Sequence, residues 1–477
     1  MNVVCIYSVS YYERLDKPLA TQCDIHFGLA SIASALKEAG FNVDLLIITP
    51  DTNIKETLMR YFRGTHQYAR LFCLTAVSSE YNRMCEVAKE IKQLNKYGHI
   101  NMGGVHVSLN PESAIECQYI DSICIGEGDR AIVELAKELE NGTNPTKINN
   151  LWFKLPSDQA LIERNPQDTF IEDLDSLPII DHSLWYPFIK DPVAMPAVLA
   201  GRGCPNKCSY CSNHKLRNIS PGKYVRFRSP WHILKELNTL WLEQPGIKSF
   251  YLEVETLSIN IPYALELCES LKAFNKARNI NMEFRVNISL YKNLLQDEKC
   301  VTFLRALKSA NVTTINIGLE SGSERIRKDI LNRPDYSNKD IIQFSQLAKL
   351  IGLKTSLYII MGLPTETHND FLETLFIILK CEPDYVQYGF FFPYPGTDIY
   401  KYALEKPPFN PSFERKRPYF DTKEFTKKQQ IHEYIWMPVF LYNNKLPFYS
   451  ILILMLKNYV VQSDTLTKIF MRLRSLF

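Results

Sequence analysis

The chain has 477 residues, of which 46% are hydrophobic and 22% charged, a balance that excludes a disordered protein and allows two or three packed domains. Its 55 basic and 52 acidic residues give a net charge of only +3, without the basic excess typical of nucleic-acid binding, so we expect no nucleic-acid partner. The N-terminus lacks the features of a signal peptide, and the best apolar stretch, 446–456, is about half the roughly 20 residues that span a bilayer. We therefore expect a cytoplasmic protein with reduced cysteines.

The first region, 1–145, alternates between strand and helix patterns. Short apolar runs rich in β-branched residues are the expected strands, and stretches with apolar residues every three or four positions are the expected helices. The expected strands are 3–8, 43–48, 71–77, a run ending at 103–104 and 122–125, and the expected helices are 27–39, 82–96 and 131–140. This alternation predicts an α/β fold with a doubly wound parallel sheet, whose ligand lies beyond the carboxyl ends of the strands.

The remaining chain falls into three further regions. Prolines and a cluster of acidic residues interrupt 146–194, which we interpret as a connector. From 401 to 477 a charged stretch is followed by an apolar, aromatic-rich helical pattern, which predicts a helical C-terminal region. Between them, over 195–400, strands are expected at 197–200, 249–253, 283–287, 314–318, 355–361 and 385–392. Six strands with intervening helices predict a partial (β/α)6 barrel.

Three closely spaced cysteines follow the first strand of the predicted barrel, in Gly201-Arg-Gly-Cys-Pro-Asn-Lys-Cys-Ser-Tyr-Cys211. Thiolates four and three residues apart can converge on one metal centre, and the glycines of this loop suit sharp backbone turns. A disulfide framework would leave one cysteine unpaired. The loop alone is compatible with a structural zinc site completed by His214, or with an iron–sulfur cubane that keeps one iron open to a small molecule.

The CxxxCxxC spacing, with the aromatic Tyr210 before the last cysteine, resembles the signature of the radical S-adenosylmethionine superfamily. The segments 250–253, 318–322, 360–366 and 392–397 resemble the cofactor-binding strands of that family. The resemblance implies a [4Fe–4S] cluster held by Cys204, Cys208 and Cys211, with S-adenosylmethionine on the open iron. Reduction, by a donor such as flavodoxin or ferredoxin, would release a 5′-deoxyadenosyl radical. The candidate contacts to S-adenosylmethionine are Tyr210, Glu253, Arg285, Glu320 and Met361.

The first region is similar to the cobalamin-binding domain that precedes the radical domain in one large subgroup of this superfamily. The similarity lies in 27–43, in Gly103-Gly-Val-His106 with the following 111–112, and in 121–129 with its Gly-Glu-Gly. It implies a Rossmann-like domain with the corrin ring across the carboxyl edge of its sheet. The Asp-x-His-x-x-Gly motif of other cobalamin enzymes is absent, which implies a cobalt without a histidine below it. The candidate contacts to cobalamin are Ser78, Ser79, Gly103, Gly104, His106, Gly126, Glu127 and Gly128.

The two resemblances imply a two-cofactor methyl transfer. Cobalt would take a methyl group from one S-adenosylmethionine, and the deoxyadenosyl radical from a second would remove a hydrogen from an unactivated carbon, which then takes the methyl. A cobalamin-dependent cyclase or rearrangement enzyme is the main alternative, and a non-catalytic cobalamin or S-adenosylmethionine sensor is the alternative from another class. The chain departs from the subgroup at 253–258, where an aspartate pair followed by Phe-Thr is usual. The expected substrate is a small or lipid-like molecule.

The C-terminal tail mixes basic and apolar side chains. Lys457, Lys468, Arg472 and Arg474 interleave with the apolar residues of 451–477. Such a mixture could lie on a membrane surface or cover a lipid-like substrate, and the alternative is a terminal helix packed on the barrel.

Overall fold

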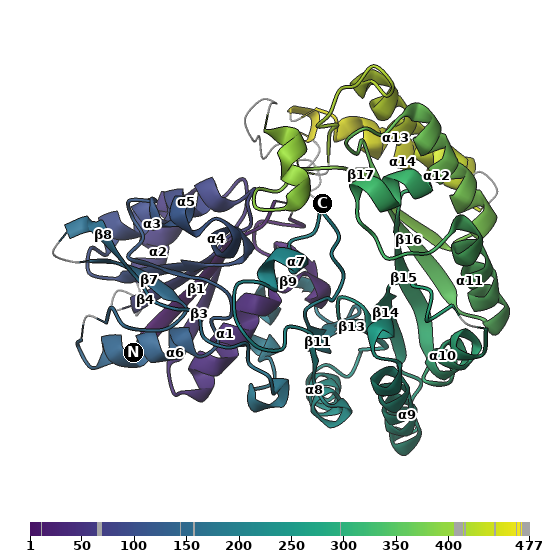
Figure 1. Ribbon diagram of the computed structural model, residues 1–477. Coiled ribbons are helices and arrows are strands. Elements are labelled where there is room, and N and C mark those ends of the chain that lie inside the picture. The colour runs from purple at the N-terminus through teal and green to yellow at the C-terminus, as the bar shows by residue number, and fades with distance from the viewer. Residues whose placement is uncertain are drawn as a thin grey trace. The chain divides into compact units, whose positions relative to one another are not determined.

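The computed structural model describes residues 1–10, 12–63, 69–143, 145–155, 158–295, 297–404, 414, 416–442, 445–463, 465–467 and 469, with the backbone alone at 158–160 and 297 (Figure 1). The chain divides into two compact units. The first unit comprises Met1–Pro205 and Ser212–Glu253, and the second comprises Asn206–Cys211 and Val254–Phe477. The cysteine loop therefore contributes to both units.

The first unit is built on a seven-stranded sheet with the order β3-β1-β4-β5-β6-β7-β8. The first five strands in this order are parallel, which confirms the predicted sheet. They are β3 (Asn42–Ile48), β1 (Asn2–Ser8), β4 (Ala69–Thr75), β5 (His99–Gly103) and β6 (Ser122–Cys124). The last two, β7 (Leu151–Leu155) and β8 (Asp158–Arg164), are antiparallel additions from the segment that the sequence predicts to be a connector.

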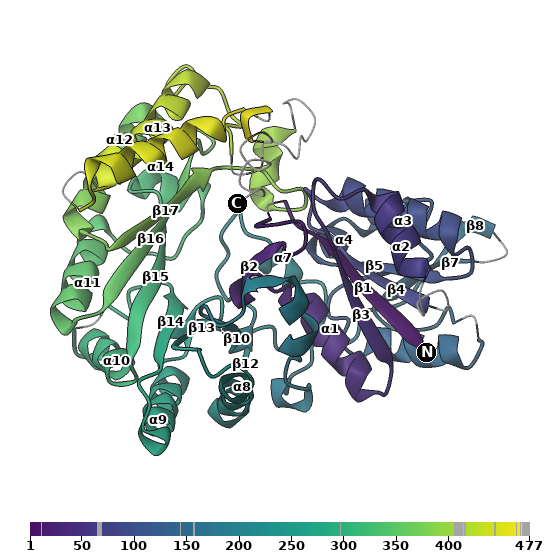
Figure 2. The ribbon, with the colours of Figure 1, turned by 180° about the vertical axis from the view of Figure 1, so that it is seen from behind.

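Helices cover both faces of this sheet, as a doubly wound fold requires (Figure 2). Alternate residues of β1 enter different cores: Val3 and Cys5 belong to the core under α1 (Phe27–Glu38) and α6 (Ala131–Glu140). Val4 and Ile6 belong to the core under α2 (Ile54–Phe62) and α3 (Tyr81–Leu94). Because both faces of the strand are buried, the sequence of β1 is a continuous apolar run instead of an alternating one.

The rest of the first unit leads into and out of the cysteine loop. Strand β10 (Ala197–Leu199) pairs in parallel with β13 (Ser249–Glu253), and β11 (Gly201–Arg202) pairs antiparallel with β12 (Arg226–Phe227). The short helix α7 (Asn213–Leu216) follows the loop, and α8 (Pro230–Glu243) connects β12 to β13. Two short strands from distant parts of the sequence, β2 (Leu19–Thr21) and β9 (Ile189–Asp191), also pair in parallel.

The second unit repeats strand and helix in chain order. Its four strands, β14 (Glu283–Ile288), β15 (Val312–Glu320), β16 (Lys354–Met361) and β17 (Tyr385–Phe390), pair in parallel with their chain neighbours. The helices are α9 (Ile261–Arg278), α10 (Asp297–Ser309), α11 (Asn338–Ile351) and α12 (His368–Cys381). Capping boxes at Ser337 and Thr367 fix where α11 and α12 begin. With β10 and β13, all six strands predicted over 195–400 are present.

The C-terminal region of the second unit is helical, as the sequence predicts. It contains α13 (Lys427–Tyr442) and α14 (Phe448–Val460), which pack against each other (Figures 1 and 2). Among the described residues, none of the helices combines the length and the apolar character needed to cross a membrane. Lys468, Arg472 and Arg474, on which the prediction for the tail partly depends, lie outside the described residues.

Candidate functional site

The second unit anchors the central part of the cysteine loop by backbone hydrogen bonds. The N–H of Ser209 donates to the carbonyl of Leu331 at 2.9 Å, and the Ser209 carbonyl accepts from the N–H of Ile399 at 3.0 Å. The Cys211 N–H donates to the Cys208 carbonyl at 3.1 Å, which closes a turn between the two cysteines. Cys208 is buried and Cys211 is half-buried. The loop is thus held in place by the segments that follow β15 and β17.

A buried guanidinium contacts the thiol of Cys208. Arg333 Nη1 donates to Cys208 Sγ at 3.8 Å and to the Tyr210 hydroxyl at 3.2 Å. The Tyr210 hydroxyl donates in turn to Glu320 Oε1 at 2.9 Å, and Arg333 Nη1 lies 3.6 Å from the same oxygen. The structure therefore brings together two of the predicted contacts, Tyr210 and Glu320, and joins both to one cluster cysteine through Arg333.

The backbone of β15 directs Glu320 into this group. The strand register shifts between Gly318 and Glu320, and Glu320 has a left-handed φ of 63°. Such a conformation is uncommon for a residue with a side chain and is concentrated at functional sites. Burial raises the pKa of Glu320, against the charge of Arg333 and the hydrogen bond from Tyr210. Burial also raises the pKa of Tyr210, so the phenol stays protonated and acts as the donor.

Sequence reasoning missed Arg333. The residue lies in the turn that follows the π-helical segment Ile326–Ile330, between Asn332 and a proline. A single arginine before a proline resembles a solvated loop charge, and only the fold brings it to Cys208. The burial of its side chain with a carboxylate and a phenol is typical of a site residue, and the sequence does not show it.

The other predicted contacts to S-adenosylmethionine occupy separate places. Arg285 lies half-buried on β14, and Met361 is fully buried at the end of β16, where its carbonyl accepts from the N–H of Phe391 at 2.7 Å. Glu253 ends β13 in the first unit, and its carbonyl accepts from the N–H of Ala200 at 2.8 Å. These three residues remain predicted contacts.

The first unit gathers the predicted cobalamin residues at one edge of its sheet. Because β4, β5 and β6 are adjacent and parallel, the loops after them, with Ser78, Gly104 and Gly126, meet at their carboxyl ends. Gly104 has a φ of 100°, and a Cβ there would lie 2.6 Å from Thr75 Oγ1, so only glycine fits. His106 Nδ1 hydrogen-bonds to the Ser78 hydroxyl at 3.0 Å.

Two polar atoms at this edge lack a partner among the described residues. They are His106 Nε2 and the hydroxyl oxygen of Ser79, and both are buried. Buried polar atoms are nearly always hydrogen-bonded in folded proteins, so two of them on neighbouring loops fit a bound polar group. Burial lowers the pKa of His106, which leaves the ring neutral. The residues at this edge therefore fit a large ligand with hydrogen-bonding groups, such as cobalamin.

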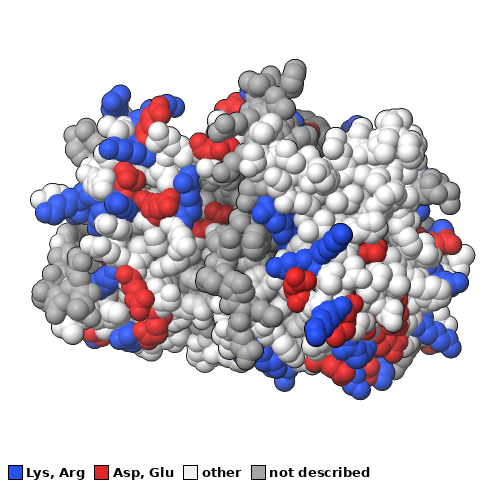
Figure 3. All heavy atoms as spheres, turned by 90° about the horizontal axis from the view of Figure 1, so that it is seen from above, with Lys and Arg blue, Asp and Glu red and all other residues white. Residues whose placement is uncertain are grey.

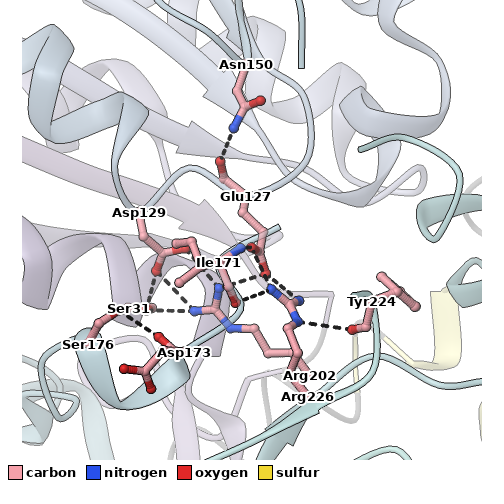
Figure 4. A network of polar contacts seen from close by, with 10 residues as sticks. All are labelled: Ser31, Glu127, Asp129, Asn150, Ile171, Asp173, Ser176, Arg202, Tyr224 and Arg226. Carbon is pink, nitrogen blue, oxygen red and sulfur yellow. Dashed lines mark hydrogen bonds and ion pairs between the residues drawn. The ribbon is translucent and has the colours of Figure 1, made fainter. Parts of the chain in front are cut away.

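Glu127 of the Gly-Glu-Gly loop is bound to two arginines (Figure 4). Its carboxylate accepts from Arg226 Nη2 at 2.8 Å and Nη1 at 3.0 Å, and from Arg202 Nη1 at 3.1 Å. Arg202 also binds Asp129 through both terminal nitrogens, at 2.9 and 3.0 Å, and donates to the Ser31 hydroxyl at 2.9 Å. The side chain of Glu127 thus binds the β11–β12 pair, and its backbone carbonyl accepts from Asn150 Nδ2 at 2.9 Å.

This charge network fixes the entrance to the cysteine loop, because Arg202 lies two residues before Cys204. Two carboxylates face two guanidinium groups, all partly or fully buried, so the charges balance. Burial acts to raise the pKa values of Glu127 and Asp129, but both pKa values are lowered overall: Arg226 and Arg202 lower that of Glu127, and Arg202 with the Ser31 hydroxyl lowers that of Asp129. Between Arg202 and the cysteine, Gly203 has a φ of 87°, and a Cβ there would lie 2.3 Å from the Tyr224 carbonyl. The turn before Cys204 therefore requires glycine.

The three loop cysteines remain the predicted metal ligands. Cys204 belongs to the first unit and Cys208 and Cys211 to the second, and among the described residues no group of three or more His, Cys, Asp or Glu side chains is assembled as a metal site. None of the twelve cysteines forms a disulfide. Three thiols on one loop, one of them accepting a hydrogen bond from a buried guanidinium, fit the donor chemistry of an iron–sulfur cluster.

Two family models match the chain. The model of the B12 binding domain matches residues 22–136, and the model of the radical SAM superfamily matches residues 198–378. The two matches cover the sheet edge of the first unit and the cysteine loop with most of the strands that follow it. The fold and the site therefore define a class, the iron–sulfur enzymes with an additional cobalamin-binding domain.

Similar proteins agree with this class. An uncharacterized methyltransferase of Pyrococcus horikoshii is 29% identical over 335 residues, which cover 69% of this chain and 68% of that protein. An anaerobic magnesium-protoporphyrin IX monomethyl ester cyclase of Rubrivivax gelatinosus is 26% identical, over 79% of this chain and 66% of that protein. The radical S-adenosylmethionine methyltransferase TsrM of Kitasatospora setae has the same fold, with a TM-score of 0.64 at 17% identity over 83% of this chain and 75% of TsrM.

Residues 22–136 therefore match a B12 binding domain and residues 198–378 a radical SAM domain, so the chain is a radical SAM enzyme with a cobalamin-binding domain. The predicted family is confirmed, and so is the predicted fold class, a Rossmann-like domain followed by a partial (β/α)6 barrel and a helical region. The cofactors of such an enzyme are a [4Fe–4S] cluster, S-adenosylmethionine and cobalamin, as predicted.

Replacing Arg202 by Met should destabilise the protein strongly. The change leaves the buried Asp129 carboxylate without a countercharge and Glu127 with Arg226 alone, which costs about 3–5 kcal/mol of unfolding free energy. In the wild type the two carboxylates have lowered pKa values, so their stabilisation is present above the ordinary carboxyl pKa and is lost as the pH falls through the lowered values. Urea unfolding of the full chain at several pH values should therefore show a shallower acid dependence in Arg202→Met.

A matched control is Arg60→Met, which breaks the exposed pair of Arg60 with Glu56 on α2. Such a pair contributes less than about 1 kcal/mol. Equal unfolding free energies for Arg202→Met and Arg60→Met would contradict the role assigned to the buried network.

Replacing Arg333 by Met should lower the reduction potential of the reconstituted cluster. Removal of a positive charge and of a hydrogen bond to a ligating sulfur makes an additional electron on the cluster less favourable. Arg333→Lys keeps the positive charge, so the reduction potential of its cluster should lie between those of the wild type and Arg333→Met. The measurement is an anaerobic redox titration followed by electron paramagnetic resonance, with bound iron as the check on folding. Unchanged potentials at full iron content would show that Arg333 does not act on the cluster.

Proposed function

We propose that this enzyme transfers a methyl group to an unactivated carbon of a small-molecule or lipid-like substrate. The observation that carries the proposal is the presence, in one chain, of a cobalamin-type sheet edge and a radical SAM cysteine loop, together with similarity to a methyltransferase over 69% of the chain. Twelve cysteines without a disulfide support a reducing compartment such as the cytoplasm, where flavodoxin or ferredoxin could supply electrons.

The bound cofactors supply the chemistry: the cluster with S-adenosylmethionine gives a radical that removes a hydrogen atom, and cobalamin gives the methyl group. The residues of the chain bind and position these groups. Cys204, Cys208 and Cys211 would hold the cluster, and Arg333 fixes the rotamer of Cys208 while it binds Tyr210.

On the cobalamin side, residues at the sheet edge would hold the corrin ring. The neutral ring of His106 and the hydroxyl of Ser79 are the buried groups that a ligand can satisfy, and Gly104 lets the backbone approach closely. Arg202 binds the Gly-Glu-Gly loop and so positions the entrance to the cysteine loop within the same unit. These residues position the cofactors, whereas the cysteines are the groups that bind the reacting centre.

A second candidate function is ring formation or rearrangement with the same cofactors. The observation that favours it is the similarity to the anaerobic cyclase of Rubrivivax gelatinosus, which extends over 392 residues. Both functions use the same cysteines, so only the product separates them. A non-catalytic sensor would not need reductive cleavage of S-adenosylmethionine.

The full chain, purified without oxygen and reconstituted with iron, sulfide and hydroxocobalamin, should bind about four irons and one cobalt. Under reduction it should release 5′-deoxyadenosine from S-adenosylmethionine. Cys208→Ala should abolish this release, because the cluster loses a ligand, while Cys268→Ala, which changes a buried cysteine of α9 outside the loop, should keep it. Zinc in place of iron, or no deoxyadenosine from the wild type, would contradict the assignment; cofactor binding without cleavage would favour the sensor.

Methylation is distinguished from cyclisation by the fate of the donor methyl group. With S-adenosylmethionine deuterated in its methyl group, we expect small-molecule and lipid extracts incubated with the enzyme to yield a product that carries the intact deuterated methyl. Mass spectrometry of the extracts is the measurement, and Cys208→Ala is the control. A product that depends on the enzyme but carries no deuterium would overturn methyl transfer in favour of the cyclase.

A further inference from the structure

Helix α14 (Phe448–Val460) exposes a continuous apolar face. Only Ile451 and Asn458 are buried, and Asn458 Nδ2 donates to the Tyr434 carbonyl of α13 at 2.7 Å. These residues, seven apart, mark the face that packs inward. The rest of the helix surface exposes Phe448 (71%), Tyr449 (67%), Leu452 (46%), Ile453 (61%), Leu456 (61%) and Tyr459 (56%).

The spacing of these side chains makes one stripe along the helix. Residues 449, 452, 453 and 456 follow the three- and four-residue steps that align on one side of an α-helix. Figure 3 shows the surface at its upper right, where α13 and α14 lie, as mostly free of charged residues, which gather at the lower edge of that part. Six exposed apolar side chains on one short helix are typical of a binding surface.

The charged residues of α14 and of the segment directly before it are lysines. From 434 to 463 the sequence contains Lys445 and Lys457 and no Asp or Glu. Both lysines are exposed, and Lys457 lies on α14 itself between Leu456 and the inward-facing Asn458. Beyond the described helix, 464–477 adds Lys468, Arg472 and Arg474 against Asp464 alone. A partner for this face must therefore tolerate aliphatic contact and carry negative charge.

We propose that α14 docks this enzyme on the surface of an anionic lipid bilayer. Aromatic rings at both ends of the stripe, aliphatic side chains between them and flanking lysines are the composition of an interfacial helix. The helix has 13 residues and is about 20 Å long, which is too short to span the bilayer. It would therefore lie parallel to the membrane surface, between head groups and acyl chains. A second copy of the chain fits less well, because α14 offers no carboxylate to pair with Lys457 of the other copy across a two-fold interface.

The test is co-sedimentation of the full reconstituted chain with vesicles of phosphatidylglycerol and phosphatidylcholine, compared with phosphatidylcholine alone. We expect binding to the anionic vesicles that weakens with salt and little binding to the neutral ones. The double variant Ile453→Glu with Leu456→Glu should bind about tenfold more weakly or worse, because it puts two charges into the apolar stripe. Leu350→Glu on α11, where the side chain is 84% exposed, is the matched control and should bind as the wild type does.

Three results would overturn the proposal: no sedimentation of the wild type with anionic vesicles, equal sedimentation of the double variant, or a dimer in light scattering that the double variant abolishes. The last result would assign the face to a second copy. Deoxyadenosine release without vesicles should be the same in the wild type, the double variant and the control. A failure of docking is therefore distinguishable from a failure of the proposed function.

Discussion

The ion pairs of Arg202 and Arg226 with Glu127 and Asp129 are the contacts on which the arrangement of the first unit depends. Removing four charges from water is costly, and the cost is offset only because each guanidinium binds carboxylate oxygens at short distance and the signs balance. The Gly-Glu-Gly loop after β6 and the strand before Cys204 are therefore fixed to each other by charge instead of by apolar packing. Ion pairs with these short distances form only when the loop and the strand take one position relative to each other. Apolar contacts are less directional and would allow several positions.

Charged side chains are also central to the second unit, but there they contact a cysteine that is a predicted ligand of the cluster. Arg333 neutralises Glu320, holds the Tyr210 hydroxyl and donates to Cys208, so one cation serves three partners. A carboxylate at a strained backbone position is tolerated because its partners determine its orientation. The first unit uses paired arginines to hold a loop, while the second uses one arginine to set the surroundings of a thiolate.

The sequence predicts the strands well because strands buried on both faces are continuous apolar runs, and it predicts the family because the cysteine spacing is local. It does not reveal β7 and β8, which lie at the antiparallel edge of the first sheet within a proline-interrupted segment. Long-range pairings are likewise hidden: Glu127 suggests a ligand contact from its glycine neighbours, yet its partners are 75 and 99 residues away. Arg333 reaches Cys208 across 125 residues. Periodicity and spacing are local properties, and neither contains information about such distances along the chain.

The path of the chain between the two compact units limits how the enzyme can be divided. The backbone passes from one unit to the other at 205–206, at 211–212 and at 253–254, so the six-residue centre of the cysteine loop belongs to a different unit from its flanks. A fragment that begins at residue 195 would take Arg202 and Arg226 away from Glu127 and Asp129 and leave an N-terminal piece with two buried, unneutralised carboxylates. Exchanging the cobalamin-binding half between relatives, by recombination or in the laboratory, therefore requires the recipient to supply matching arginines on either side of its cluster motif.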